Sequence, residues 1–374
     1  MNGDFHYYAT YCAAAIAGYS HAEALDIAFC AQLTDYCSKT LLAKLNGPKD
    51  AATTQLKSEL ADARTDILGL QEITRIWTSF HFLPRDLYAE VHGSRNYCRK
   101  YRLICGPNGD LLGKTVELAD GACLQAVGLA MHVLADTWAH TYFAGTPSLV
   151  INNTDHNFYE LIPDGEYYKR RPVVFTHNPT VKDDPQTGTY VASLYQSSEK
   201  SIMNLGHGRA GHLPDYSFIR YAYAPAWANY REIIKNNPED YLHAFAQMVY
   251  AMRFLRGKES AFRPDTYAWD EIRPYLDAIN ALTAVRRTDD SEDWKALGES
   301  ITGETIPPFD LEAHQQEYRS ASPEEKDDTF LGRYFQAAIA QKAMVTAELE
   351  ASGNTLGGRS GIKNLLRFLE ERLS

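Results

Sequence analysis

The chain has 374 residues, and its 45% hydrophobic content is enough for a sizeable core, which excludes a globally disordered protein. Its net charge of −11 at pH 7 excludes a broad nucleic-acid-binding surface, because most of its faces would repel a phosphate backbone. The charge does not exclude a metal site in a cleft, where divalent ions would reverse the local field.

The sequence contains no signal for export or for membrane insertion. The first residues, from Met1 to His6, have no basic stretch followed by an apolar one, and no run of about 18 apolar residues occurs. We therefore expect a cytoplasmic protein without a transmembrane segment. The cysteines form no C-x2-C pair, so we expect free buried thiols; they are Cys12, Cys30, Cys37, Cys98, Cys105 and Cys123.

Three helices are predicted in the first 80 residues. The first covers 4–18, and the second begins at the capping box formed by Ser20 and Glu23 and runs to about Asp35. The third covers 52–79 and stops before Pro84, because a proline disfavours the helical conformation of the residue before it.

The predicted secondary structure changes twice in the middle of the chain. Residues 91–115 look irregular or strand-like, whereas 116–143 form an apolar helical pattern that predicts a central, buried helix. Residues 146–214 are rich in proline, glycine, asparagine and aspartate, with only weak strand signals at 173–175 and 190–192. A stretch of this length without helices is typical of a lid or a site loop.

Helical patterns resume after this insertion, and 286–322 is expected to be a polar surface excursion. The predicted helices are 215–236, 238–257, 266–284, 323–350 and 359–373. Together these patterns predict an all-α fold, a multi-helix bundle with one long irregular insertion. We expect a single domain over 1–374, with a metal-site core in 1–145, a lid in 146–214 and further helices in 215–374.

The strongest chemical signal is His132-x3-Asp136-x3-His140. Residues four apart lie one turn apart on one face of a helix, and the neighbours here are apolar, so the three side chains should point inward together. Imidazole and carboxylate are both metal ligands, and a carboxylate can bridge two ions. The alternative is a hydrogen-bonded triad without a metal, in which pairing alone offsets the cost of the buried charge.

Weaker candidates lie near the ends of predicted segments: His6, Asp35 and His81. The glycine-rich stretch 206–215 adds His207, Arg209 and His212, with Arg209 a possible partner for an anionic group and Asp215 a possible N-cap of the next helix. The histidines without such a context are His21, His92, His156, His177, His243 and His314.

The order of these motifs resembles that of the zinc-dependent phospholipase C and P1 nuclease superfamily. The resemblance rests on His6, Ala31-x3-Asp35, Ser79-Phe80-His81-Phe82 and His132-x3-Asp136, and covers roughly the first 145 residues. Over its whole length the chain is similar to an uncharacterised bacterial family with Phe-His-Tyr-Tyr, Phe-His-Phe-Leu-Pro, Ala-Asp-Thr-Trp-Ala-His and Gly-His-Gly-Arg-Ala-Gly-His-Leu-Pro-Asp segments. In the superfamily, five residues separate the aspartate from the next histidine, whereas three separate Asp136 from His140.

The superfamily is all-helical, binds a cluster of three zinc ions and hydrolyses phosphoesters. The resemblance implies that Asp35, His81 and His132 hold one ion, that Asp136 bridges two and that His6 holds a third. His140 would then bind the remaining ion together with His207 or His212. One, two or three ions, or a site that has lost its metal, all fit the sequence.

The resulting hypothesis is a metal-dependent hydrolase, with zinc as the expected cofactor and Asp35 and Arg209 as catalytic residues. The substrate would be a small phosphoester, such as a phosphodiester, a nucleotide or a phospholipid headgroup. Two alternatives remain: a different His/Asp metalloenzyme that uses iron or manganese, and a non-enzymatic helical protein with a structural or lost metal site.

Overall fold

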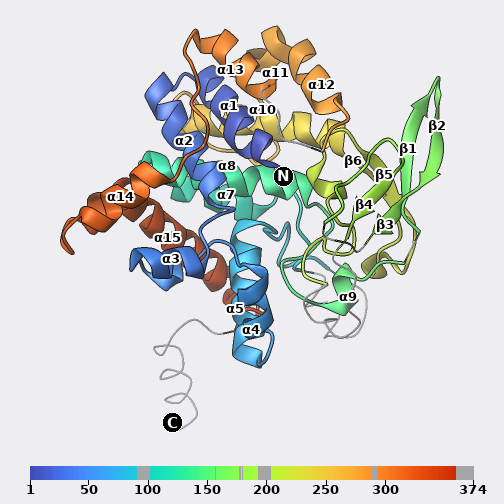
Figure 1. Cartoon of the computed structure of the whole chain (residues 1–374), viewed down its shortest axis with the longest axis horizontal. Coiled ribbons are helices and arrows are strands. Elements are labelled where there is room, and N and C mark those ends of the chain that lie inside the picture. The colour runs from blue at the N-terminus through green and yellow to red at the C-terminus, as the bar shows by residue number, and fades with distance from the viewer. Residues whose placement is uncertain are drawn as a thin grey trace.

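The computed structural model describes residues 1–90, 102–155, 157–176, 178, 180–192, 204–288 and 293–358. Its centre is helix α8 (Leu124–Ala139), which is surrounded by helices from distant parts of the sequence (Figure 1). Helices α2 (His21–Leu33), α7 (Asp110–Leu118), α10 (Asn237–Leu255) and α15 (Phe330–Ala351) pack against it. The expectation of a central, buried helix in this region is confirmed, but the helix begins at Leu124, because α7 ends before Gly121, which has a φ of 67°.

The N-terminal helices follow the predicted pattern. A π-helical turn, η1 (Asp4–Ala9), continues into α1 (Thr10–Ala17), which ends at Gly18 in the left-handed conformation. Ser20 and Glu23 form both hydrogen bonds of the capping box at the start of α2. Helix α2 can lie very close to α8, because a Cβ at Gly128 would stand only 2.3 Å from the carbonyl oxygen of Ile27.

The helix predicted over 52–79 is instead two helices, α4 (Lys57–Ala63) and α5 (Ile67–Phe80). The Asp66 side chain accepts a hydrogen bond of 2.7 Å from the backbone N–H of Gly69 and so starts the second helix. A short helix, α3 (Lys39–Leu45), and a 3₁₀ turn, η2 (Lys49–Ala51), precede them.

The all-α prediction is wrong, because the described part of the chain also contains two β-sheets. The larger is antiparallel with the strand order β2-β1-β5-β6, and the smaller is the parallel pair β3 and β4. The strands are β1 (Tyr159–Asp164), β2 (Tyr167–Pro172), β3 (Val174–Thr176), β4 (Thr189–Val191), β5 (Arg220–Tyr223) and β6 (Ile233–Asn236).

The strands were not predicted for a physical reason. The segment predicted as a helix over 215–236 contains β5 and β6, whose tyrosines and isoleucines favour a pleated, half-buried surface. In the insertion, the weak signals at 173–175 and 190–192 correspond to β3 and β4. Each of these strands has only 3 residues, too few for a clear alternating pattern.

Four further helices in the described part of the chain pack on α10, on α15 or on the first helices. Along the sequence, between α10 and α15, they are α11 (Trp269–Ile272), α12 (Leu276–Ala284), α13 (Asp293–Thr302) and α14 (Glu312–Ser320). The stretch predicted as a surface excursion thus contains two helices, and α13 packs on η1 and α1 through the buried Trp294. Residues 91–101, part of a segment predicted as irregular, and the helix predicted at 359–373 lie outside the described residues.

The chain has two apolar cores among its described residues, and Trp77 of α5 packs against both. The larger lies among the helices, and the smaller lies under the sheet and contains Phe82, Phe143 and Tyr223. No helix in the described part of the chain is both long and apolar enough to cross a membrane. Cys12, Cys30, Cys37 and Cys105 are free and buried, and Cys123 is free and partly exposed.

Lys235 ties the sheet to the end of α8. Its ammonium group, 2% exposed, donates to the carbonyl oxygen of Trp138 at 2.6 Å and to the carboxylate of Asp240. A cation at a helix C-terminus also interacts favourably with the helix dipole. The contact therefore links β6 to the turn of α8 that precedes His140.

We predict that Lys235→Met lowers the free energy of unfolding by about 1.5–3 kcal/mol, because Asp240 and the Trp138 carbonyl lose a charged donor. Urea unfolding measures this change. The control is Lys169→Met on the exposed strand β2, which should stay within about 0.5 kcal/mol of the unchanged chain. Equal effects of the two substitutions would contradict the role of Lys235.

Candidate metal centre

Helix α8 places three candidate ligands along one face. His132 and Asp136 lie in the helix and His140 caps its C-terminus, and all three are buried. Asp136 Oδ2 stands 3.2 Å from His132 Nε2 and 3.6 Å from His140 Nδ1. The four-residue spacing read from the sequence therefore puts one carboxylate between two imidazoles.

Two neighbouring helices end beside this carboxylate. Asp35 follows the C-terminus of α2, and His81 is the C-cap of α5. His81 Nδ1 lies 3.1 Å from Asp136 Oδ2 and 3.2 Å from His132 Nε2. Asp35 Oδ1 is 3.9 Å from the same two histidine nitrogens.

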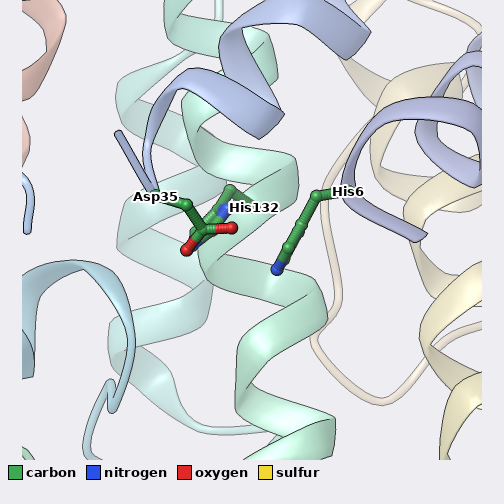
Figure 2. A group of neighbouring side chains, drawn as sticks. All are labelled: His6, Asp35 and His132. Atoms are coloured by element: carbon green, nitrogen blue, oxygen red, sulfur yellow. The ribbon is translucent and has the colours of Figure 1, made fainter. Parts of the chain in front are cut away.

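His6 reaches the cluster from the first helical turn of the chain (Figure 2). Its ring stacks on that of His132, with centroids 3.9 Å apart, and its Nε2 lies 3.2 Å from Asp136 Oδ1. His6, Asp35 and His132 present possible ligand atoms within 4.8 Å of one another, and so do His81, His132 and Asp136. The two groups share His132, so they form one centre.

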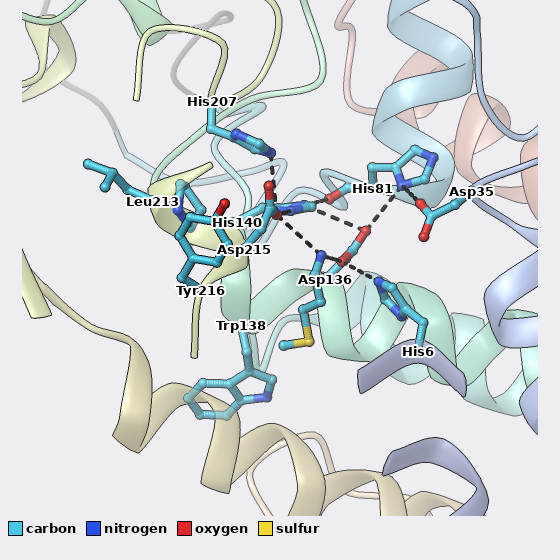
Figure 3. A network of polar contacts seen from close by, with 12 residues as sticks. His6, Asp35, His81, Asp136, Trp138, His140, His207, Leu213, Asp215 and Tyr216 are labelled. Carbon is cyan, nitrogen blue, oxygen red and sulfur yellow. Dashed lines mark hydrogen bonds and ion pairs between the residues drawn. The ribbon is translucent and has the colours of Figure 1, made fainter. Parts of the chain in front are cut away.

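A further group contains His140, His207 and Asp215, whose possible ligand atoms also lie within 4.8 Å of one another. The Nε2 atoms of His140 and His207 are 3.3 and 3.7 Å from Asp215 Oδ1 (Figure 3). Gly206 permits this arrangement, because its φ is 55° and a Cβ would stand 2.1 Å from the ring of Phe82.

Backbone carbonyls orient four of the five imidazoles. The contacts are His132 Nδ1 to Ala31 O at 2.8 Å, His81 Nε2 to Thr53 O at 3.1 Å, His140 Nδ1 to His81 O at 2.7 Å and His207 Nδ1 to Gly211 O at 2.8 Å. A carbonyl oxygen only accepts, so the nitrogen that faces it carries the hydrogen. The other ring nitrogen is then free to coordinate, as in metal sites where a carbonyl fixes the histidine tautomer.

The free nitrogens point at carboxylates and at one another. In neutral rings, the lone pairs of His132 Nε2 and His81 Nδ1 would face each other at 3.2 Å and would also face Asp136 Oδ2. Such contacts repel unless a cation, a proton or a metal ion, lies between the groups. The arrangement therefore fits a cation-binding centre better than a hydrogen-bonded triad.

His6 favours a metal ion over additional protons. Both of its ring nitrogens are buried, and within the described structure neither meets the geometry of a hydrogen bond, although Nε2 lies 3.2 Å from Asp136 Oδ1. Burial and the nearby charge of His132 lower the pKa of His6 to about 4, so the ring is neutral at pH 7. A buried polar atom without a partner costs about 1–3 kcal/mol, and coordination would remove this cost.

The α-amino group of Met1 lies between the two carboxylates of the centre. It is 3.0 Å from Asp136 Oδ1 and 3.4 Å from Asp215 Oδ1. Burial disfavours its charged form, but the negative charges of Asp136, Asp215 and Asp35 outweigh burial and raise its pKa to about 11. The ammonium group therefore supplies one positive charge to the centre.

Both inner carboxylates are ionised. Burial would raise the pKa of Asp136, but the charges of His140, the Met1 ammonium and His132 bring it well below the usual range. The pKa of Asp215 is lowered in the same way against its burial, chiefly by His207 and the ammonium group. Ionised carboxylates in so buried a place need several positive charges nearby.

The structure does not bring every predicted residue into the centre. His212 Nδ1 lies 2.8 Å from Asp183 Oδ2 and its side chain is 55% exposed, so His207 is the histidine that joins His140. Arg209, two residues after His207, donates from Nε to Asn204 Oδ1 at 2.6 Å.

The remaining histidines were expected to stand apart from the site. His21 lies 2.7 Å from the Tyr11 hydroxyl, His314 stacks on Phe330 and His243 stacks on Trp138. His92, His156 and His177 lie outside the described residues.

Two interpretations of Asp215 were open from the sequence. An aspartate in the same glycine-rich loop as two histidines is typical of a site, whereas the alternative was an N-cap. The N-cap interpretation is wrong, because the 3₁₀ turn η4 (Leu213–Asp215) is followed by the strand β5 and not by a helix. The orienting carbonyls of Ala31, Thr53 and Gly211 could not be identified from side-chain patterns.

Residues 1–349 match a family of unknown function (DUF6765), and the chain belongs to this family. No curated protein and no solved structure matches the chain. Its function must therefore be argued from the centre itself.

We predict that Asp136→Ala loses bound metal and lowers the free energy of unfolding by about 3–5 kcal/mol, because it removes the carboxylate that four imidazoles and the amine share. Elemental analysis and urea unfolding measure the two effects. His314→Ala, which changes a histidine outside the centre, should keep its metal. Full metal content in Asp136→Ala would rule out Asp136 as a ligand.

Proposed function

We propose that this member of the DUF6765 family is a metal-dependent hydrolase of phosphoesters. The observation that carries the proposal is the set of buried imidazole nitrogens that point at Asp35, Asp136 and Asp215, four of them in rings held by backbone carbonyls. The resemblance of the N-terminal motifs to the zinc-dependent phospholipase C and P1 nuclease superfamily supports the reaction class.

The distances indicate which residues would bind each metal ion. Asp35, His81 and His132 could hold one ion, with Asp136 shared between this ion and its neighbours and His6 beside it. His140, His207 and Asp215 could hold another. Zinc suits a site rich in imidazole, although iron and manganese accept the same donors.

Bound divalent ions would supply Lewis acids that polarise a phosphoryl oxygen and offset the negative charge of the transition state. The side chain of Asp35 is the most exposed of the three carboxylates, at 34% compared with 1% for Asp136 and 19% for Asp215. A carboxylate that water can reach is suited to accept the proton of the attacking water. We therefore assign this role to Asp35.

Arg209 is the candidate for binding the anionic substrate. Its Nε donates to Asn204, and within the described residues its guanidinium group forms no ion pair, so its terminal nitrogens could bind a phosphate. The net charge of −11 favours a small phosphoester, such as a nucleotide or a phospholipid headgroup, over a long nucleic acid.

The test is elemental analysis of chain purified without a metal-binding tag, followed by hydrolysis assays on p-nitrophenyl phosphate, bis-p-nitrophenyl phosphate and p-nitrophenyl phosphorylcholine. We expect two or three equivalents of zinc and hydrolysis of at least one substrate, with kcat reduced about 100-fold or more in Asp35→Asn. One equivalent of iron or manganese without hydrolysis would indicate a different metalloenzyme. Failure to take up any metal on titration would overturn the proposal.

Arg209→Ala should lower kcat/KM about 10- to 100-fold and leave the metal content unchanged, because it removes charged hydrogen bonds to the substrate but no ligand. The matched control is Arg231→Ala, an exposed arginine outside the centre, which should have full activity. Loss of metal in Arg209→Ala, or equal activity of the two variants, would refute substrate binding by Arg209.

A further inference from the structure

A cavity of about 300 Å³ lies away from the metal centre, between α7, the beginning of α8 and the first half of α15. Its volume is at the lower end of the ~300–1,000 Å³ range of small-molecule sites. Most of the wall is apolar, and the residues that matter for the argument are Leu118, Ala119, Ala126, Leu129, Ala337 and Ala340.

The cavity is open to solvent and unusually apolar for an exposed surface. Leu118 in its wall is 40% exposed, and alanines from α8 and α15 face it where larger side chains would fill the space. Two of the polar side chains in the wall bond to each other, since Gln341 Nε2 donates to Thr115 Oγ1 at 3.0 Å, and Gln341 also donates to Ser79 O at 3.2 Å. These polar groups already have partners, so the interior favours an apolar ligand.

The two charged residues of the wall differ in their partners. The carboxylate of Asp327 accepts a hydrogen bond of 3.2 Å from Gln336 Nε2. Arg333 is exposed and forms no ion pair within the described parts of the chain. A ligand with an apolar body and one anionic end would match this combination, because its body displaces water from the alanines while its anion pairs with the guanidinium group.

We propose that this cavity binds a single aliphatic chain that ends in a carboxylate, a medium-chain fatty acid, with the chain against the alanines and the carboxylate on Arg333. The site is separate from the metal centre and does not depend on the proposed hydrolase activity. It gives the protein a second ligand of a different chemical class.

Isothermal titration calorimetry of the full chain with hexanoate, octanoate and decanoate tests the proposal. The Kd should fall about fourfold for each added methylene until the cavity is full, as expected for burial of methylene groups. Arg333→Gln should weaken decanoate binding about two- to fivefold and leave 1-decanol binding unchanged. No binding of decanoate, or no dependence on chain length, would overturn the proposal.

A matched pair of substitutions on α15 locates the site. Ala337→Phe fills the cavity and should weaken decanoate binding more than tenfold, whereas Ala347→Phe, on an exposed position of the same helix, should not change it. Thermal unfolding verifies that both variants fold. Equal decanoate binding by the two variants would overturn the location, and a change of oligomeric state in Ala337→Phe without decanoate binding would assign the surface to a second copy of the chain.

Discussion

The ionised carboxylate of Asp136 is the constraint on which the rest of the structure depends. It lies in the last turn of the buried helix α8 and is 1% exposed, so an unpaired charge there would be prohibitive. Its two oxygens are within 3.2 Å of the Met1 amine, His6, His81 and His132. These partners come from the N-terminus, α5 and α8, so folding must bring separate parts of the chain together around one charge.

The centre lies where helices end, which explains how backbone groups can orient it. His81 caps α5, His140 caps α8 and Asp35 follows α2. Carbonyls near helix ends and in the following turns are free to accept from imidazole N–H groups. The larger sheet also helps to position the centre. Asp215 lies in the segment before β5, and Lys235 of β6 donates a hydrogen bond to the end of α8. The mixed fold is thus part of how the second ligand group is positioned.

The sequence predicted those features that depend on local spacing. The stripe of His132, Asp136 and His140 and the capping box of α2 follow from helical periodicity, so both could be read from the chain. The sheets could not be predicted in full. Strands β3 and β4 gave only weak signals and the segment with β5 and β6 was predicted as a helix, because strands of three or four residues are too short for a clear alternating pattern. The choice between His207 and His212 depends on how a loop turns, which pattern alone does not determine.

The charges of the centre also determine which protons metal ions would replace. Burial lowers the pKa of His132, but Asp136 and Asp35 outweigh burial and raise it, and the Met1 amine is charged as well. These protons can balance the carboxylates in the folded chain until metal ions replace them. Metal binding would therefore release protons, because imidazoles must be deprotonated to coordinate. The large apolar core around α8 adds stability that does not depend on the centre.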